Sequence, residues 1–389
     1  MATQISSGVA AIQAVADEWL QLWEEAQPDH PFCHPDWIDA YLRCFEPSSR
    51  VWLLTARLGG RLLGVLPLIQ DRAVFHGLPV RRIRAAVNSH SFRFDILRMP
   101  GPEGDAVLSS MWNCLRGFPG WDVLEIPSLP YPGTGEQWLT LAQAGGFPTL
   151  HNAQRMLHIA LTGAAGQQNP WQGDANSRFR KDLRRLARRA AEGLHGSLQF
   201  ERVDEPGPEQ MEKLFAIESS GWKGRQRTAI SSRPETKNFY SAIAASFAKR
   251  RCSSLHFLKA GERTLSILYS LQIGKVVVAL KLGCAEEYLH YSPGHLLFNE
   301  MAHDSWQRGF SELDLGPEMD YKLHWTRQGR HTAHCFIFSR HTYGRFLLRY
   351  KTRLRPAVKR FLYRVLGRAG DPGNADPPDR ADEDSSSTK

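Results

Sequence analysis

The chain of 389 residues is 42% hydrophobic and 23% charged, with a net charge of +9. Such a chain can bury a full core, which excludes wholesale disorder and favours two domains over one. No apolar run approaches the roughly 18 residues of a membrane-spanning helix, and six cysteines without a CxxC pair indicate neither a disulfide framework nor a zinc ribbon.

The beginning of the sequence lacks the features of a secretory signal. Residues 1–19 contain no lysine or arginine, and Asp17 and Glu18 stand where a signal peptide would be apolar. We therefore expect a cytoplasmic protein whose cysteines are reduced and mostly buried.

The positive charge is concentrated in two segments. Residues 176–195 hold seven lysines and arginines against two acids, and residues 340–368 hold ten against none. The remaining sequence is slightly acidic. A surface that is positive over the whole fold, as a DNA-binding protein would need, is therefore not expected.

An internal repeat divides the chain. Residues 53–69 (LLTARLGGRLLGVLPLI) align without a gap on residues 255–271 (LHFLKAGERTLSILYSL), and both read as a β-hairpin with a glycine turn. Further paired features keep the same order in both halves. They are Pro35, Asp36 and Tyr41 with Pro234, Glu235 and Tyr240; Pro100-Gly101 with Pro293-Gly294; 116–118 with 308–310 (Arg-Gly-Phe); and the strands 123–126 and 312–315.

Each half therefore predicts the order helix, strand, strand, strand, helix, strand, which is an α/β fold with a mixed sheet. A polar segment at 163–176, rich in Gly, Gln and Asn, predicts the boundary between the halves. The predicted units are a first domain over 1–165, a second over 176–340, a basic helical segment over 341–369 and a disordered tail over 370–389.

Three motifs in the second half carry a family resemblance. They are Glu218-Ser-Ser-Gly-Trp-Lys-Gly-Arg225, Tyr291-Ser-Pro-Gly-His-Leu-Leu297, and Asp314-Leu-Gly-Pro-Glu-Met-Asp-Tyr-Lys322 followed by Trp325. With them, the second half resembles bacterial GNAT-type acetyltransferases grouped with the CelD proteins of cellulose and exopolysaccharide synthesis. These are related to the tandem-GNAT FemAB transferases of peptidoglycan cross-bridges. The resemblance extends weakly into the first half.

The resemblance implies two tandem GNAT-like domains, of which the first is degenerate and the second catalytic. It implies an N- or O-acyltransferase that moves an acyl group, expected to be acetyl, from acyl-CoA to an amine or hydroxyl of a small-molecule or glycan acceptor, without a metal. No catalytic triad, nucleophile elbow or P-loop occurs in the sequence, which favours direct transfer over an acyl-enzyme.

A turn between a strand at 276–282 and a helix at 296–307 is the candidate site for the CoA pyrophosphate, because backbone N–H groups at a helix N-terminus bind anions. Its candidate cofactor-binding residues are Tyr291, Ser292, Gly294, His295 and Leu296. GNAT enzymes carry a glycine-rich RxxGxG/A pattern here, of which only Gly294 is present. An ordinary strand-to-helix turn is the alternative.

Glu218 is the first candidate catalytic residue. A carboxylate near the end of the predicted helix 208–219 could deprotonate an incoming ammonium or hydroxyl group; a solvated helix end is the alternative. Trp222, Lys223 and Arg225 follow in a glycine-flanked loop, where two cations and an indole suit a phosphate- or sugar-bearing ligand.

A second set of candidates follows the last strand of the repeat. Asp314 and Lys322 are predicted to be catalytic, and Asp320, Tyr321 and Trp325 to bind substrate, because ligands gather beyond the carboxyl ends of strands in open α/β sheets. The alternative is that Lys322 simply pairs with Asp314 or Asp320.

Arg178 and Arg180 lie in the first turn of a predicted helix over 177–192. Cations at a helix N-terminus oppose the macrodipole by roughly 0.3–1 kcal/mol each, so a purely stabilising role is not expected. We predict that they face an anionic substrate, with simple surface solvation as the alternative.

The basic C-terminal segment has apolar residues at three- and four-residue steps over 345–366, with Pro356 as a break. It predicts an amphipathic helix on an anionic membrane surface. Packing of its apolar face on the second domain is the alternative.

Two other functions compete with acyl-CoA-dependent transfer. A FemAB-like transferase would use aminoacyl-tRNA, but no long heptad segment provides a coiled-coil arm, so tRNA is not the expected partner. The second competing function is that of a catalytically weak, membrane-associated binding module of a polysaccharide-synthesis complex.

Overall fold

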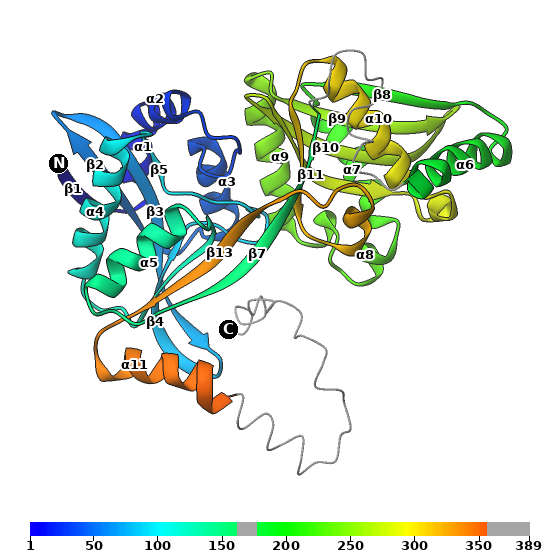
Figure 1. The fold of residues 1–389 in the computed structure, drawn as a ribbon. Coiled ribbons are helices and arrows are strands. Elements are labelled where there is room, and N and C mark those ends of the chain that lie inside the picture. The colour runs from blue at the N-terminus through cyan, green and yellow to red at the C-terminus, as the bar shows by residue number, and fades with distance from the viewer. Residues whose placement is uncertain (162–176, 356–389) are drawn as a thin grey trace, which may run out of the picture.

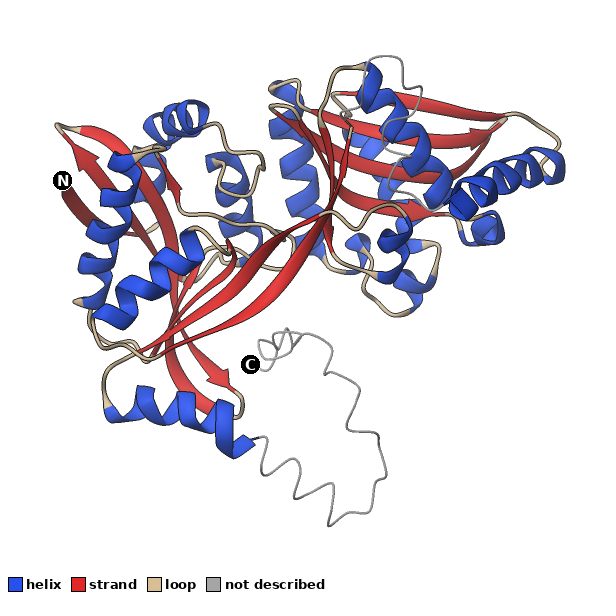
Figure 2. Ribbon diagram, in the orientation of Figure 1, coloured by secondary structure: helices blue, strands red, loops and turns tan. Residues whose placement is uncertain are grey.

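The computed structural model describes residues 1–161 and 177–355, excluding the side chains of Ser177, Trp222 and Lys223. These residues form two α/β lobes that share one mixed 13-stranded sheet (Figures 1 and 2). Its strand order is β1-β2-β3-β4-β6-β13-β7-β12-β11-β10-β9-β8, with β5 beside β3.

The first lobe takes its elements from the first half of the chain. They are β1 (Ala2–Ser7), α1 (Val9–Ala14), α2 (Ala16–Ala26), α3 (Pro35–Phe45), β2 (Arg50–Leu58), β3 (Arg61–Phe75), β4 (Leu78–Ala85), β5 (Leu97–Arg98), α4 (Pro102–Arg116), β6 (Val123–Pro130), α5 (Thr134–Ala144) and β7 (Thr149–Ala160).

The second half repeats this order. Its elements are α6 (Ser177–Gly193), β8 (Leu198–Asp204), α7 (Pro208–Ser219), α8 (Trp222–Arg225), η2 (Ile230–Ser232), α9 (Pro234–Lys249), β9 (Ser253–Ala260), β10 (Arg263–Ile273), β11 (Val276–Cys284), η3 (Glu286–Tyr291), α10 (Pro293–Gln307), β12 (Glu312–Pro317), η4 (Asp320–His324), β13 (Gly329–Phe338), α11 (Thr342–Arg349) and η5 (Tyr350–Leu354).

The predicted repeat is present in the structure. The two predicted hairpins are β2–β3 and β9–β10, and the helices expected before them are α3 and α9. These two equivalent helices pack against each other, with the rings of Trp37 and Phe239 5.2 Å apart. The mixed α/β class predicted for each half is therefore confirmed.

The two halves exchange strands. β7 ends the first half but pairs with β12 of the second, whereas β13 follows β12 and pairs with β6 of the first. β7 and β13 also pair with each other along nine residues, Gly329↔Leu157 to Ile337↔Thr149, and they cross between the lobes in Figure 1. β13 lies within the range that we predicted for the second domain, yet its backbone completes the sheet of the first lobe.

A buried ion network lies beside the exchanged strands. Arg93, on a loop of the first half, donates from Nη1 to Asp314 Oδ2 of β12 at 2.7 Å and from Nη2 to Asp29. Arg330 of β13 pairs with Glu312 of β12 and approaches Asp29 at 3.5 Å. The network therefore joins a first-half loop to both strands at the junction of the lobes.

The C-terminal helix α11 packs on the first lobe. Leu347 is fully buried among Val80, Val123 and Phe338, and the Tyr343 hydroxyl donates to the carbonyl oxygen of Pro79 at 2.6 Å. The alternative that this segment packs on the second domain is therefore wrong for its described part. Residues 356–366 of the predicted helix, the whole predicted linker at 163–176 and the predicted tail at 370–389 lie outside the described residues.

The six cysteines are free thiols, as expected. The expectation that most are buried is wrong, because only Cys33 and Cys335 are fully buried and the others are partly exposed. Among the described residues, no helix combines the length and apolarity needed to cross a membrane.

We expect Leu347→Ala to lower the free energy of unfolding by about 2–4 kcal/mol, because it leaves a cavity under α11. Leu354→Ala should change it by less than about 0.5 kcal/mol, since Leu354 is 48% exposed. Urea unfolding monitored by tryptophan fluorescence measures both. Equal effects would show that α11 does not rest on the first lobe.

We expect Arg93→Met to destabilise the protein by about 3–5 kcal/mol, because it leaves Asp314 buried without its cationic partner. Arg57→Met removes a surface ion pair with Glu18 and should cost less than about 1 kcal/mol. The same unfolding experiment compares the two variants. A small loss for Arg93→Met would mean that the network does not hold the lobes together.

Candidate functional site

The strands β11 and β12 separate at the centre of the second lobe. They are parallel neighbours over three pairs only, Val276–Val278 with Glu312–Asp314, after which β11 runs on to Cys284 while β12 pairs with β7. The first lobe repeats this arrangement with β4 and β6. Ligands gather at the carboxyl ends of such strands, so the diverging ends of β11 and β12 are the candidate site.

The predicted anion-binding turn lies at this point. Ser292 has a positive φ of 52° and Pro293 begins α10, a helix of 15 residues whose first turn has no acidic side chain. A Cβ on Gly294 would lie 3.1 Å from Leu282 Cδ2 and 3.2 Å from Cys284 Sγ, so glycine lets α10 start close against β11. The positive dipole end of α10 therefore lies beside the diverging strand. In its first turn Pro293 has no N–H, and the N–H groups of His295 and Leu296 donate to the carbonyl oxygen of Ser292 at 3.0 and 3.3 Å, which leaves the N–H of Gly294 as the candidate anion donor.

Aromatic rings bring α6 to the same turn. Phe179 contacts His295, His324 and Trp325, with ring centroids 5.1–5.4 Å apart. Arg178 and Arg180 flank Phe179 in the sequence. The structure therefore brings the first turns of α6 and α10 together, although the two helices are more than 100 residues apart.

Three of the predicted residues at the turn, Tyr291, His295 and Leu296, have defined surroundings. His295 Nδ1 accepts a hydrogen bond from Trp325 Nε1 at 3.0 Å, and burial together with His324 lowers the pKa of His295 to about 4. Leu296 is buried in the core of the second lobe. The Tyr291 hydroxyl lies against α6 at Gly193, where a Cβ would meet it. His295 is therefore a neutral ring fixed by Trp325, and Tyr291 holds α6 in place.

Glu218 is buried, which excludes the alternative of a solvated helix end. Its Oε2 accepts the backbone N–H of Ile230 at 2.7 Å, and its backbone packs against Gly283 of β11. Burial and the nearby Glu218 carboxylate raise the pKa of Tyr240 well above its usual value. Glu218 and Tyr240 are thus neighbours beside the diverging part of β11.

Lys322 lies in η4, the turn after β12, and it is 7% exposed. Nζ donates to the carbonyl oxygen of Pro317 at 2.8 Å, and burial lowers the pKa of Lys322 to about 8, although Asp314 opposes this shift. Its neighbours Asp320 and Tyr321 are exposed. Lys322 is therefore a buried amine that changes charge close to neutral pH.

Asp314 has both carboxylate oxygens occupied. Oδ2 accepts from Arg93, and Oδ1 accepts from the backbone N–H of Gly316 at 2.8 Å. Gly316 has φ 73° and meets the ring of Phe92, so only glycine fits there. Among the described ion pairs, Asp314 pairs with Arg93, whereas Lys322 donates to the carbonyl oxygen of Pro317. The alternative that Lys322 pairs with Asp314 is therefore wrong. This environment suits a carboxylate that positions the end of β12.

The predicted loop after Glu218 is a short helix, α8, in the structure. Arg225 pairs with Glu286 of η3 at 2.5 Å on the surface. The side chains of Trp222 and Lys223 lie outside the described residues. The binding roles predicted for these three residues remain predictions.

A loop of the first half reaches this site, and our sequence reasoning missed it. Tyr240 Oη and His90 Nδ1 are 3.2 Å apart, Phe92 contacts Gly316, and Arg93 binds Asp314. Burial, with Lys281 nearby, lowers the pKa of His90 to about 3. The internal repeat could have predicted this loop, because residues 88–95 follow β4 in the first half as residues 286–292 follow β11 in the second.

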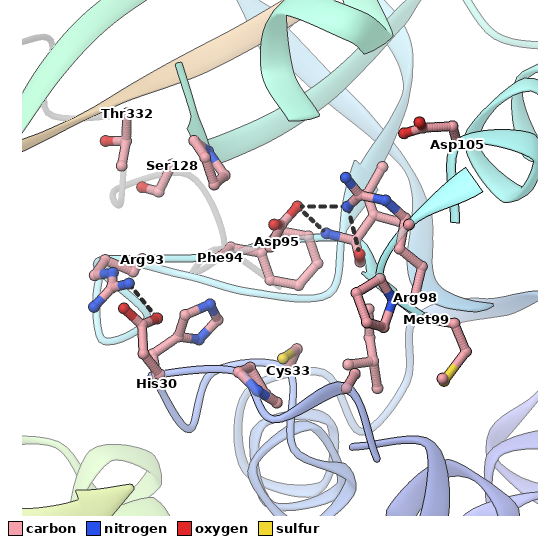
Figure 3. A pocket seen from close by; sticks show the side chains of 18 residues that line it. His30, Cys33, Arg93, Phe94, Asp95, Arg98, Met99, Asp105, Ser128 and Thr332 are labelled. Atoms are coloured by element: carbon pink, nitrogen blue, oxygen red, sulfur yellow. Dashed lines mark hydrogen bonds and ion pairs between the residues drawn. The ribbon is translucent and has the colours of Figure 1, made fainter. Parts of the chain in front are cut away.

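A cavity of about 270 Å³ lies on the other side of this loop, in the first lobe (Figure 3). Asp29, Asp95 and Asp105 line it together with Arg93 and Arg98, both of which form ion pairs with these acids. Burial raises the pKa of Asp95. Asp29 and Asp95 are thus paired with the two arginines, and the acidic and basic side chains that line this cavity nearly balance.

Comparison with known proteins identifies the second half. Residues 177–323 match the model of the acetyltransferase (GNAT) domain, whereas no curated protein sequence matches the chain significantly. The structure is similar to that of FemX, with a TM-score of 0.53, 12% identity, and coverage of 86% of this chain and 97% of that one. The C-terminal domain of a putative lysylphosphatidylglycerol synthetase from Agrobacterium fabrum is similar as well, with a TM-score of 0.51, 12% identity, and coverage of 88% and 97%.

These structural likenesses show a shared fold across both lobes, and the domain match covers every candidate catalytic residue. Residues 177–323 form a GNAT acetyltransferase domain, and the chain is by class an acyltransferase.

Proposed function

We propose that the second lobe binds acyl-CoA where β11 and β12 diverge and transfers its acyl group directly to an amine or hydroxyl acceptor. The observation that carries this proposal is the close approach of the α10 N-terminus to β11, with Arg178 and Arg180 on the adjoining turn of α6. The N–H of Gly294, the positive dipole end of α10 and these arginines would hold the pyrophosphate.

Glu218 is the proposed proton acceptor. Its position beside β11 is fixed by Ile230, and it lies next to Tyr240, which contacts His90 of the first half. In the transfer, the acceptor nitrogen or oxygen bonds to the thioester carbon, the C–S bond breaks, and Glu218 takes the acceptor proton, directly or through water. The CoA thiolate leaves and is protonated by solvent or by a group in the site.

Lys322 is proposed to act as a buried ammonium. Its carbonyl partner Pro317 holds it at the end of β12, where a cation can stabilise the charge that develops on the thioester oxygen. Asp314 is proposed to position this end of β12 rather than to accept a proton, because Arg93 and Gly316 occupy both of its oxygens.

The acceptor is proposed to approach from the first lobe. Arg93 lines the cavity of the first lobe and also binds Asp314 at the end of β12, so this cavity adjoins the proposed donor site. Its carboxyl oxygens can accept hydrogen bonds from an acceptor with an amino group. An amino sugar or a polysaccharide precursor would meet this requirement. It would also agree with the resemblance to CelD proteins of exopolysaccharide synthesis.

A second candidate uses aminoacyl-tRNA as the donor. The exposed arginines of α6, among them Arg184, Arg188 and Arg189, give one face of this lobe the charge that an RNA needs. Binding measurements with CoA and with tRNA distinguish the two donors.

We expect millimolar acetyl-CoA to raise the melting temperature, because a ligand that binds only the native state stabilises it by mass action. Glu218→Gln should retain this shift but lose at least about 100-fold in CoA release with amine acceptors. Glu212→Gln, an exposed change on the same helix, is the control and should retain both. No shift with CoA, combined with a shift with tRNA, would favour the second candidate.

We expect kcat/KM to fall as pH rises through about 8, because Lys322 loses its proton there. Lys322→Met should be less active but should lack this fall, and Lys322→Arg should move it to higher pH. Burying the ammonium also opposes folding, so the free energy of unfolding should increase between about pH 8 and pH 10.5 in the wild type. Activity that rises through pH 8 would instead make the neutral amine the base.

A further inference from the structure

The outer surface of α11 and η5 combines charge with exposed apolar side chains. We call it the α11 face and define it by Arg345, Phe346, Arg349, Arg353 and Leu354. Figure 1 shows α11 at the end of the first lobe, beside the hairpin of β3 and β4 and away from α6. The α11 face is thus separate from the candidate acyl-transfer site.

The arginines of the α11 face lie one helical turn apart and point away from buried Leu347. All three are exposed, and no acidic residue occurs between 340 and 355. None of them forms an ion pair with another described side chain, in contrast to Arg82, Arg84 and Arg93 of the same lobe. Their charge is therefore not neutralised by residues 1–161 and 177–355.

Apolar and aromatic side chains lie between these arginines. Phe346 is 40% exposed and Leu354 is 48% exposed, and Val74 on the adjoining hairpin is 55% exposed. The ring of Phe346 lies 6.2 Å from that of Tyr343 and 6.0 Å from that of Tyr350. A row of aromatic rings beside a row of cations is typical of helices that lie in the lipid headgroup region.

The surface is held firmly on the lobe. Leu347 is buried, Tyr343 donates to Pro79, and Lys351 Nζ lies 4.6 Å from the ring centroid of Phe336 and 5.4 Å from that of Phe75. The helix therefore does not have to fold on binding, and its outward side chains are presented together.

We propose that the α11 face docks the protein on an anionic phospholipid surface, with Arg345, Arg349 and Arg353 contacting lipid phosphates and Phe346 and Leu354 entering the headgroup region.

The helix α6 differs from α11 in its apolar side chains. It also exposes arginines, but its apolar side chains Phe179, Leu183 and Leu186 pack into the second lobe, and none of its described side chains is a large exposed hydrophobic. Exposed apolar groups beside the charge therefore favour lipid over nucleic acid at α11.

The test measures how much of the full chain sediments with lipid vesicles. The vesicles consist of phosphatidylcholine alone or of phosphatidylcholine with about 30% phosphatidylglycerol as the anionic lipid. Binding should require the anionic lipid and weaken with salt. Each cation near such a surface contributes about a factor of five, so Arg345→Gln, Arg349→Gln and Arg353→Gln combined should weaken binding by more than about 50-fold. Phe346→Ser should weaken it several-fold at unchanged charge.

Matched controls keep the test specific. Arg184→Gln, Arg188→Gln and Arg189→Gln remove the same charge from α6, and Leu58→Ser removes a residue as exposed as Leu354 from the β2–β3 hairpin. Both should bind vesicles within about twofold of the wild type, and circular dichroism should show all variants folded. Three results would overturn the proposal. The α6 variant could lose as much vesicle binding as the α11 variant, or Phe346→Ser could lose none. The full chain could also bind tRNA through the α11 arginines while it fails to bind vesicles.

Discussion

The exchange of β7 and β13 is the constraint on which the rest of the structure depends. In the first half β7 follows β6 along the chain but pairs with β12 of the second half. In the second half β13 follows β12 but pairs with β6 of the first half. Because unpaired backbone groups in a buried sheet are costly, neither lobe can complete its sheet alone. The Arg93 network lies at this junction and links a loop of the first half to both β12 and β13.

The exchange also explains why the candidate site includes residues from both halves. β12 pairs with β7 from Glu312 to Pro317 but with β11 only from Glu312 to Asp314, and the loop carrying His90 and Arg93 lies against the end of β12. The first lobe retains the diverging strands of the repeat, but its cavity is lined by aspartates. The two copies of one fold therefore differ in their linings. The first turn of α6, with Arg178 and Arg180, lies at the candidate site of the second half, whereas paired aspartates and arginines line the cavity of the first.

Local patterns predicted much of this architecture. Alternating hydrophobic residues and glycine turns identified both hairpins, and the proline residues at 35, 234 and 293 begin the expected helices. The strand exchange could not be predicted, because β7 and β13 read equally well as partners within their own half. Asp314 was correctly placed at the end of a strand, but its partner Arg93 is 221 residues away and no local pattern links them. The burial of Glu218 was missed for the same reason, since Gly283 and Ile230 cover it from other elements.

Hydrogen–deuterium exchange with and without acetyl-CoA tests the central claim most directly, namely that the donor binds where β11 and β12 diverge. Exchange should slow in residues 279–296 and at the start of α6, because bound ligand would cover these backbone N–H groups. Residues 93–105 around the cavity of the first lobe should be unaffected by the donor alone. Protection confined to residues 93–105, with none at 279–296, would contradict the account and assign the donor to the first lobe.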